Sequence, residues 1–397
     1  MNRFAWASLL VVGACGSNGT TWIGAQIAED VGKPARDAGN EAIASCTPVG
    51  PGDVCTALAP RVLPALTVQG NQILQKGRPY HLYAIARSDL LWGELNNDGC
   101  NGDDHFHDAD VELMTGWNIN AVRIGLAQAR WFGRKCDGAT YGTRLDHAVA
   151  MANAHGLYAI LELHWTDVGG KAPCDAGCDI GLQPMPDVEN IQLWKEVAAR
   201  YGNNPGVLFD IFNEPATGDW SCWRNGGCTV NAGTVPGVSY TAAGMQQLFD
   251  AVRSSAANSV VIVAGANLAE DLSGIGGYLI AGDQIVYGAH VYRGLGGATS
   301  DWLARFGSLG ATNPVMATEL GSFDCSGDQT LRLMDYLDAP LADPAVRISW
   351  GIRSWARPGQ CGYPSIIADW DGTPLGAQGL AVRDHLRSYG AAAGAVP

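Results

Sequence analysis

Two glutamates are the strongest candidates for chemistry in this sequence, because each lies at the end of an apolar run. Glu214 follows the run at residues 207–212, and Glu319 ends the run at residues 314–319. A charged side chain in such a place is costly unless it has a partner or a task. Two carboxyl groups around one bond can divide the work of an acid and a nucleophile, and hydrolysis of a glycosidic bond needs such a pair.

Other polar and aromatic side chains lie at the ends of neighbouring apolar runs. They supply guanidinium, imidazole, indole, amide and phenol groups, and they are Arg123, His164, Trp165, Asn213, His290, Tyr292 and Trp355. A single glutamate at a strand end could simply cap a helix or pair with an arginine. Two glutamates surrounded by these groups favour an active site over that structural explanation.

The elements that must position these residues alternate regularly along the chain. Apolar runs are found at residues 80–86, 119–126, 157–164, 207–212, 260–264, 285–292, 314–319 and 346–355. Stretches of helical period are found at residues 108–115, 144–155, 188–201, 241–258, 301–309, 329–337 and 375–388. Continuous apolar strands separated by helices indicate a parallel sheet buried on both faces. Eight of them predict an α/β fold, a closed (β/α)₈ TIM barrel.

The barrel prediction places the candidate residues on one face. The first run is not followed by Gly-x-Gly-x-x-Gly, which argues against an open dinucleotide-binding sheet. Chemistry in a (β/α)₈ barrel gathers at the carboxyl ends of the strands. Glu214 on the fourth strand and Glu319 on the seventh would then face one another across the mouth. Residues 68–83 contain two turn signals and predict a small hairpin that closes the barrel floor.

Several motifs, in order along the chain, resemble those of the cellulase family, family 5 of the glycoside hydrolases. They are Leu163-His164-Trp165, Phe212-Asn213-Glu214-Pro215, His290-Val291-Tyr292 and Ala317-Thr318-Glu319-Leu320-Gly321. The resemblance covers roughly residues 67–390 and is specific, because the motifs follow the right order on the right strands.

The resemblance implies a role for each matched residue. Glu214 would be the acid/base and Glu319 the nucleophile of a retaining mechanism. Asn213 would hold the sugar 2-hydroxyl, while Tyr292 and Arg123 would bind Glu319 and keep it ionised. The remaining implied role, orienting the substrate hydroxyls and Glu214, would fall to His164 and His290.

By the same resemblance, Trp355 would be the aromatic platform under the sugar at the cleavage point. Trp350 competes for this role, but an unbroken strand would place the two rings on opposite faces. The chain departs from the family pattern at Ala356, where relatives often carry Asn, and in the less acidic segment at residues 128–131. Both departures concern substrate recognition rather than the catalytic pair.

Tryptophans could also line a cleft, because sugars present apolar C–H faces that stack on flat rings. The candidates at or beyond strand ends are Trp92, Trp131, Trp165, Trp220, Trp223 and Trp355. Taken singly, each is explained better by packing. The insertion at residues 216–239 and the loop after the third strand would form the walls of the cleft.

The N-terminal residues 1–14 read as a signal peptide with a short apolar core. They precede Cys15 in a pattern that resembles the lipobox of bacterial lipoproteins, so Cys15 would carry a lipid anchor; cleavage after Ala14 and plain secretion is the alternative. Residues 15–66 would form a tether and a disulfide-stapled N-terminal extension, and residues 67–392 the catalytic domain. We expect an exported protein.

Without Cys15, ten cysteines remain, an even number that favours disulfides in an exported chain. Sequential pairing closes short loops and is our prediction: 46–55, 100–136, 174–178, 222–228 and 325–361. A zinc site built from cysteines 174, 178, 222 and 228 is the less favoured alternative, because it lacks a neighbouring histidine.

Composition excludes several function classes. The 397 residues carry a net charge of −14 without a basic run, so a nucleic-acid partner is not expected. Only 16% of residues are charged and 47% are hydrophobic, which excludes a long disordered or coiled-coil protein.

Two possible metal sites have better explanations. His105-Phe106-His107 resembles the His-x-His of metal-dependent barrel hydrolases, but it opens a helix and reads as a helix-entry loop. The oxygen-rich stretch at residues 96–104 could hold calcium but lacks the closing Glu of an EF-hand loop. We therefore expect no metal and no cofactor.

Together these features predict a monomeric, retaining β-glycosidase acting on a β-glycan, with endo-β-1,4-glucanase as the favoured activity. Mannan, β-1,3-glucan, xylan or a glycolipid headgroup are alternative substrates within the same family. A non-catalytic carbohydrate-binding barrel is an alternative of another class, against which the presence of both Glu214 and Glu319 argues.

Overall fold

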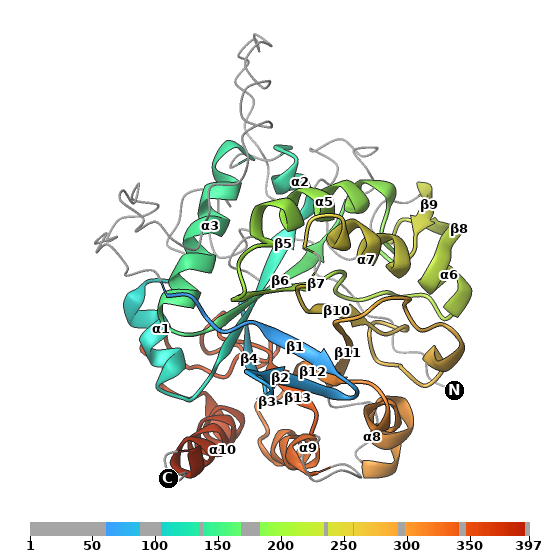
Figure 1. Cartoon of the computed structure of the whole chain (residues 1–397). Coiled ribbons are helices and arrows are strands. Elements are labelled where there is room, and N and C mark those ends of the chain that lie inside the picture. Colours follow the sequence, from blue (N-terminus) through green and yellow to red (C-terminus); the bar gives the residue numbers. More distant parts are fainter. Residues whose placement is uncertain are drawn as a thin grey trace. The chain divides into compact units, whose positions relative to one another are not determined.

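The apolar runs form eight parallel strands that close into a barrel, which confirms the predicted fold (Figure 1). The computed structural model describes residues 61–87, 105–134, 138–167, 183–233, 237–256, 258–292, 298–340 and 347–393. Around the barrel the strands are β4 (Tyr83–Arg87), β5 (Ala121–Ala127), β6 (Tyr158–Trp165), β7 (Val207–Asp210), β10 (Val261–Ala264), β11 (Ile285–Tyr292), β12 (Val315–Gly321) and β13 (Ser349–Ile352). Almost all of their residues are buried, so the runs are continuously apolar rather than alternating.

Helices surround the strands (Figure 1). They are α1 (Asp108–Thr115), α2 (Gln128–Trp131), α3 (Gly138–Ala154), α5 (Val188–Tyr201), α6 (Trp220–Asn225), α7 (Met245–Arg253), α8 (Thr299–Arg305), α9 (Asp328–Asp338) and α10 (Gly376–Ala393), with short 3₁₀ helices η1 (Ile275–Gly277) and η2 (Gly307–Ala311). Helix α5 shows why these segments are helical. Leu193, Trp194 and Val197 form one buried stripe, and the Asp187 carboxylate caps the first turn by accepting from two backbone N–H groups.

The prediction of one helix over residues 241–258 is wrong at its start. Residues up to Ala243 form strand β9 (Ser239–Ala243), which pairs with β8 (Gly226–Asn231), and α7 begins only at Met245. Gly244 separates the two elements, and a Cβ there would lie 2.4 Å from the backbone of Arg224 and Asn225. This close approach of two backbones requires glycine at the junction, and α7 begins directly after it.

The hairpin predicted at the barrel floor is present as a three-stranded antiparallel sheet of β1 (Leu66–Gln69), β2 (Gln72–Gln75) and β3 (Arg78–Pro79). Leu66 and Ile73 from this sheet join a buried cluster with Ile160 and Ile262 from inside the barrel. The floor is therefore closed by apolar packing, and the opposite end of the barrel is left to the candidate residues.

Two of the predicted disulfides are confirmed, Cys222–Cys228 and Cys325–Cys361. The first removes the zinc alternative, because it ties up two of the proposed ligands. The other three predicted pairs involve residues outside the described ranges. The signal peptide, Cys15, the N-terminal extension up to residue 60, Trp92 and the oxygen-rich stretch at 96–104 also lie outside them.

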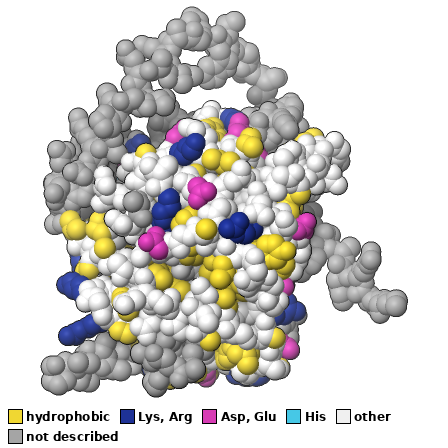
Figure 2. Space-filling model, turned by 45° about the vertical axis from the view of Figure 1, so that its right-hand side comes forward, with side chains coloured by type: hydrophobic (Ala, Val, Ile, Leu, Met, Phe, Trp, Pro, Cys, Tyr) yellow, Lys and Arg dark blue, Asp and Glu magenta, His cyan; other side chains and the backbone are white. Residues whose placement is uncertain are grey.

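Lysine and arginine side chains are interspersed with acidic and apolar ones on the face drawn in Figure 2. None of the helices in the described ranges has the length and apolarity needed to cross a bilayer.

Candidate active site

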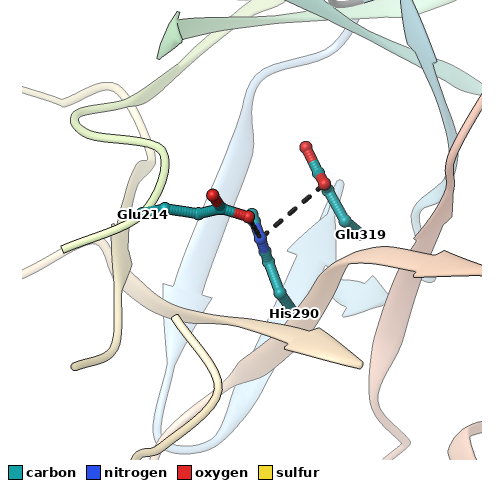
Figure 3. A group of neighbouring side chains, drawn as sticks. All are labelled: Glu214, His290 and Glu319. Atoms are coloured by element: carbon teal, nitrogen blue, oxygen red, sulfur yellow. Dashed lines mark hydrogen bonds and ion pairs between the residues drawn. The ribbon is translucent and has the colours of Figure 1, made fainter. Parts of the chain in front are cut away.

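Glu214 and Glu319 reach toward one another with His290 between them (Figure 3). Glu214 follows β7, His290 lies on β11 and Glu319 lies on β12. His290 Nδ1 is hydrogen-bonded to Glu214 Oε1 at 2.9 Å and lies 3.7 Å from Glu319 Oε2. One carboxylate oxygen of each glutamate and a ring nitrogen of the histidine lie within 4.8 Å of one another. The structure thus brings together the two carboxyl groups that the sequence singles out.

A bulge in β12 places Glu319 in this group. Ala317 pairs with Ala289 of β11, but the next pair joins Glu319 to His290, so Thr318 is an extra residue. Side chains alternate between the two faces of a strand, and one extra residue changes the face on which the following side chain lies. The irregularity therefore sets which residue of this strand faces the histidine.

Three side chains donate hydrogen bonds to the buried carboxylate of Glu319. Arg123 Nη1 lies 2.6 Å from Oε1, the Tyr292 hydroxyl donates to Oε2, and Arg353 Nη1 lies 3.0 and 2.9 Å from the two oxygens. Burial alone would raise the pKa of Glu319, but Arg353, His290 and Arg123 hold that pKa well below its usual range. The side chain is therefore ionised in the free protein.

Arg123 is the centre of a buried charge network. Its Nε lies 2.8 Å from Asp210, its Nη1 3.4 Å from Glu162, and its Nη2 donates to Asn213 Oδ1 at 3.1 Å. Sequence reasoning missed Glu162 and Asp210, which lie inside the apolar runs rather than at their ends. A carboxylate inside an otherwise apolar strand was the available signal, since burial of such a group requires a cationic partner.

The pKa values of this network differ with the surroundings of each group. Burial raises the pKa of Asp210 to about 6 despite the Arg123 guanidinium. Burial would also raise the pKa of Glu162, but Arg123 and His164 lower it below its usual value. Burial would lower the pKa of His290, but Glu319 and Glu214 raise it above its usual value. His290 therefore keeps its positive charge between the two glutamates to a higher pH than an ordinary imidazole does.

Asn213 and His164 are both buried beside the glutamates. Arg123 fixes the orientation of the Asn213 amide, because the amide oxygen must face the guanidinium. The Asn213 Nδ2 donor then has no hydrogen-bond partner among the described residues. His164 Nδ1 is bonded to Glu162 Oε1 at 2.6 Å, which holds the imidazole ring at the end of β6.

The expectation that Trp355 forms an aromatic platform is not supported. Its side chain is 0% exposed and packs edge-to-face on Trp117, so it offers no ring face to a sugar. The physical reason is that β13 ends at Ile352, so strand alternation does not continue to Trp355. Trp350 is buried as well and bonds to Asp338.

Arg353, which sequence reasoning passed over, lies at the nucleophile candidate instead. It directly follows β13, as Asn213 follows the apolar run of β7, and it contacts both Glu319 oxygens. Its Nη2 lies 3.2 Å from the Tyr363 hydroxyl, and its guanidinium lies 5.0 Å from the centre of the Tyr363 ring. A charged residue inside the last apolar run, three positions after Trp350, was the signal that could have identified it.

The other candidate tryptophans divide into exposed and buried rings. Trp165, at the end of β6, Trp220 and Trp131 are partly exposed. Trp223 is fully buried and donates to the Ala264 carbonyl, while Trp131 donates to Glu196 at 2.8 Å. Trp165 and Trp220 therefore remain candidates for sugar contact.

A second acidic cluster follows β6. Asp167, Asp187 and Glu189 place carboxylate oxygens within 4.8 Å of one another. Arg134 crosses the cluster, with Nη1 2.7 Å from Asp167 and Nη2 2.6 Å from Glu189. Asp187 accepts the backbone N–H groups of Glu189 and Asn190.

His105 and His107 lie at the entry to α1, as predicted. The His105 ring stacks on Trp370 at 4.1 Å, and His107 is the N-cap residue of the helix. By distance alone, Glu214, His290 and Glu319 could share a cation. Arg123 and Arg353 already neutralise Glu319 there, and they would repel a divalent ion.

Comparison with known proteins identifies relatives over most of the chain. The family model described as Cellulase (glycosyl hydrolase family 5) matches residues 92–353. Endoglucanase Z of Dickeya dadantii is 24% identical over 267 residues, 66% of this chain and 53% of its own length. Endoglucanase 5 of Pectobacterium carotovorum is 24% identical over 337 residues, 80% of this chain and 56% of its own length. The chain thus spans little more than half the length of these curated relatives.

Solved structures share the fold. A β-glucanase from Saccharophagus degradans, solved in complex with cellotetraose, aligns with a TM-score of 0.61 at 22% identity, over 83% of this chain and 94% of that one. The catalytic domain of an endoglucanase from Thermobifida fusca aligns with a TM-score of 0.56 at 18% identity. This alignment covers 81% of this chain and 97% of that one.

Proposed function

Because the chain belongs to the cellulase family, family 5 of the glycosyl hydrolases, we propose that it is a retaining glycoside hydrolase that cleaves β-linked glucans. The observation that supports this most is the approach of a Glu214 oxygen to a Glu319 oxygen within 4.8 Å. Retaining glycosidases hold their two carboxyl groups about 5–5.5 Å apart, whereas inverting enzymes need a wider gap for a water molecule.

In the proposed mechanism Glu319 is the nucleophile and Glu214 the acid/base. A Glu319 oxygen attacks the anomeric carbon, the bond to the leaving oxygen breaks, and that oxygen takes the proton of Glu214. Water then gives a proton to Glu214 and attacks the same carbon, which releases the sugar from Glu319 with its configuration retained. The buried cations around Glu319 support this assignment, because they keep it ionised and ready to attack.

The surrounding residues have supporting roles in this proposal. Arg123 and Tyr292 orient the nucleophile, and His290 links it to Glu214. Asn213 has an amide N–H without a described partner, and a sugar 2-hydroxyl would supply one. Since hydrogen bonds to this hydroxyl strengthen as charge develops at the ring, the contact would favour the transition state. His164 and Trp165 would contact the glucan from the end of β6.

The favoured substrate is a β-1,4-glucan, cleaved internally by a monomeric exported enzyme that carries its lipid anchor at Cys15. The choice of a β-1,4-glucan is supported by similarity to endoglucanases and to a β-glucanase solved with cellotetraose. Mannan, β-1,3-glucan, xylan and a glycolipid headgroup are the alternative substrates within the family. No metal or cofactor takes part in the proposed chemistry.

The experiment that tests this proposal is a product profile on a panel of neutral β-glycans. Soluble cellulose derivatives and mixed-linkage glucan should be cut into oligosaccharides, and NMR of the fresh products should show the β-anomer first. Initial appearance of the α-anomer would contradict the retaining mechanism. Cleavage of mannan or xylan alone would contradict the substrate assignment.

A further inference from the structure

The hydrogen bonds of Glu319 occupy the lone pairs that its proposed reaction with a sugar would need. An ionised carboxylate has about four lone-pair sites. Arg123 and Tyr292 each use one, and Arg353 Nη1 bridges both oxygens and uses two. The side chain is 0% exposed. In the free protein, therefore, no lone pair of this carboxylate is open to a sugar.

The position of Arg353 also conflicts with a bound substrate. Reacting atoms in a productive complex lie about 3–3.5 Å apart before bond formation. Arg353 Nη1 already lies 2.9–3.0 Å from each Glu319 oxygen. This nitrogen therefore occupies the space in front of both oxygens. An anomeric carbon can come within about 3–3.5 Å of either oxygen only after the nitrogen moves away.

Of the three donors, Arg353 is the one that can leave. The Arg123 side chain is 1% exposed and is held by Asp210, Glu162 and Asn213. Tyr292 belongs to strand β11. The Arg353 side chain is 14% exposed and follows the end of its strand.

Arg353 also has a second partner at hand. The Tyr363 hydroxyl and ring lie beside the guanidinium, and a cation over an aromatic face is stabilised there. Moving from Glu319 toward this ring would not leave the arginine without a partner.

We propose that Arg353 is a displaceable cover on Glu319: it bridges the nucleophile in the free enzyme, and the incoming sugar must push it aside. The inference rests on the proposed function of Glu319. Arg353 is then a positioning residue, because it holds the carboxylate in place and ionised until substrate arrives. It also makes substrate binding weaker than the site would otherwise allow, since only the uncovered fraction of molecules can bind.

Charged and titratable groups face Glu319 from every neighbouring element. They are Arg123 on β5, Glu162 and His164 on β6, Asp210 and Glu214 at and after β7, His290 and Tyr292 on β11, and Arg353 after β13. Removal of the Arg353 cation should therefore raise the pKa of Glu319 while the rest of the set stays in place.

The test compares Arg353→Gln, Arg353→Lys and the control Arg357→Gln. The Arg357 guanidinium lies 4.2 Å from the centre of the same Tyr363 ring, so Arg357→Gln removes a second cation from that ring. Arg353→Gln should lower KM roughly three- to tenfold and move the acid limb of the kcat/KM profile up by about one pH unit. Arg353→Lys keeps the charge, so its acid limb should stay near that of the parent enzyme.

Binding of cellotetraose, measured by calorimetry, separates this inference from the proposed function. In the Glu214→Gln background, which should not turn over, adding Arg353→Gln should tighten binding by the same factor. Weaker or unchanged binding would overturn the cover, and thermal unfolding checks that each variant is folded. Failure of the parent enzyme to cleave any glycan would instead contradict the proposed function, while the binding comparison would still decide the role of Arg353.

Discussion

The barrel carries two acidic clusters that are similar in residue type. They differ in how many of the buried polar atoms in and around them have a hydrogen-bond partner. In each of them three ligand-type atoms lie within 4.8 Å of one another. In the Asp167–Asp187–Glu189 cluster, Arg134 and the first turn of α5 take up the carboxylates. This cluster fixes the loop after β6 to a helix and has the marks of a structural ion-pair network.

The Glu214–His290–Glu319 cluster and its neighbour Asn213 differ from it. The buried donor Asn213 Nδ2 has no hydrogen-bond partner among the described residues, and neither has the ring nitrogen His290 Nε2. An unsatisfied buried donor costs about 1–3 kcal/mol, so its retention in a folded protein calls for an explanation. A substrate that supplies the missing acceptors provides one. The comparison teaches that unused hydrogen-bonding capacity, rather than the presence of carboxylates, distinguishes a site from a scaffold.

The largest expected effect is the loss of Glu319, the proposed nucleophile. Glu319→Gln keeps the shape of the side chain but cannot form the covalent glycosyl–enzyme, and kcat should fall by about 10³-fold or more. The matched control is Glu189→Gln in the other cluster, which should retain activity close to the parent. Comparable losses in both variants would remove the distinction between the clusters.

Loss of the acid/base should depend on the leaving group. Glu214→Gln should reduce kcat by about 10²–10⁴-fold on an unactivated glucan, because no proton reaches the departing oxygen. An aryl glycoside with a good leaving group needs no such proton in the first step, so a burst of released phenol should persist. Equal losses on both substrates would contradict the assignment of Glu214.

The two arginines should differ in their effect on stability. Arg123 is buried among three carboxylates, and Arg123→Met should lower the free energy of unfolding by about 3–5 kcal/mol, because it removes the cation that all three share. Arg134 is 24% exposed, and Arg134→Met should cost no more than about 1 kcal/mol. Urea unfolding at neutral pH measures both, and similar losses would show that the two networks are equally buried in solution.

The smallest effect concerns Asp187, whose pKa burial raises to about 6. A folded-state pKa above the unfolded value of about 3.9 stabilises the fold at lower pH, and that stability is lost as pH rises through about 6. Asp187→Asn keeps a capping oxygen but has no proton to lose. Between pH 4 and 7 the free energy of unfolding should therefore fall less in Asp187→Asn than in the parent. The difference between the two falls should be up to about 3 kcal/mol.

Urea unfolding at the two pH values measures this difference. Asp210 also has a pKa raised to about 6, but it is present in both proteins and cancels from the comparison. An identical pH dependence in the two proteins would show that Asp187 titrates near its usual value.

The sequence was sufficient to predict the barrel and to single out the two glutamates that the structure brings together, because both inferences depend on patterns with a simple physical cause. A strand buried on both faces must be continuously apolar, and a glutamate at its end is conspicuous. The positions of Glu214 and Glu319 near one another follow from closure of the sheet.

The failures have a common cause, which is that an apolar run does not show where the chain leaves the sheet. Strand β13 ends at Ile352, so alternation counted as far as Trp355 gave the wrong surroundings for that ring and hid Arg353. Glu162 and Asp210 were hidden because their partner, Arg123, comes from another strand. A carboxylate inside an apolar run signals that a cationic partner is needed, but which cation supplies it depends on closure of the barrel.

The disulfide between Cys325 and Cys361 gives the site a dependence on its chemical environment. Cys325 follows the strand that carries Glu319, and Cys361 lies two positions before Tyr363, the alternative partner of Arg353. A bond that closes a loop of this length stabilises a fold by about 4 kcal/mol in the chain-entropy view. In a reducing compartment the tyrosine would lose this tether to the nucleophile's own loop. The proposed movement of Arg353 between Glu319 and Tyr363 would then depend on an oxidising environment, in which the disulfide keeps Tyr363 in place.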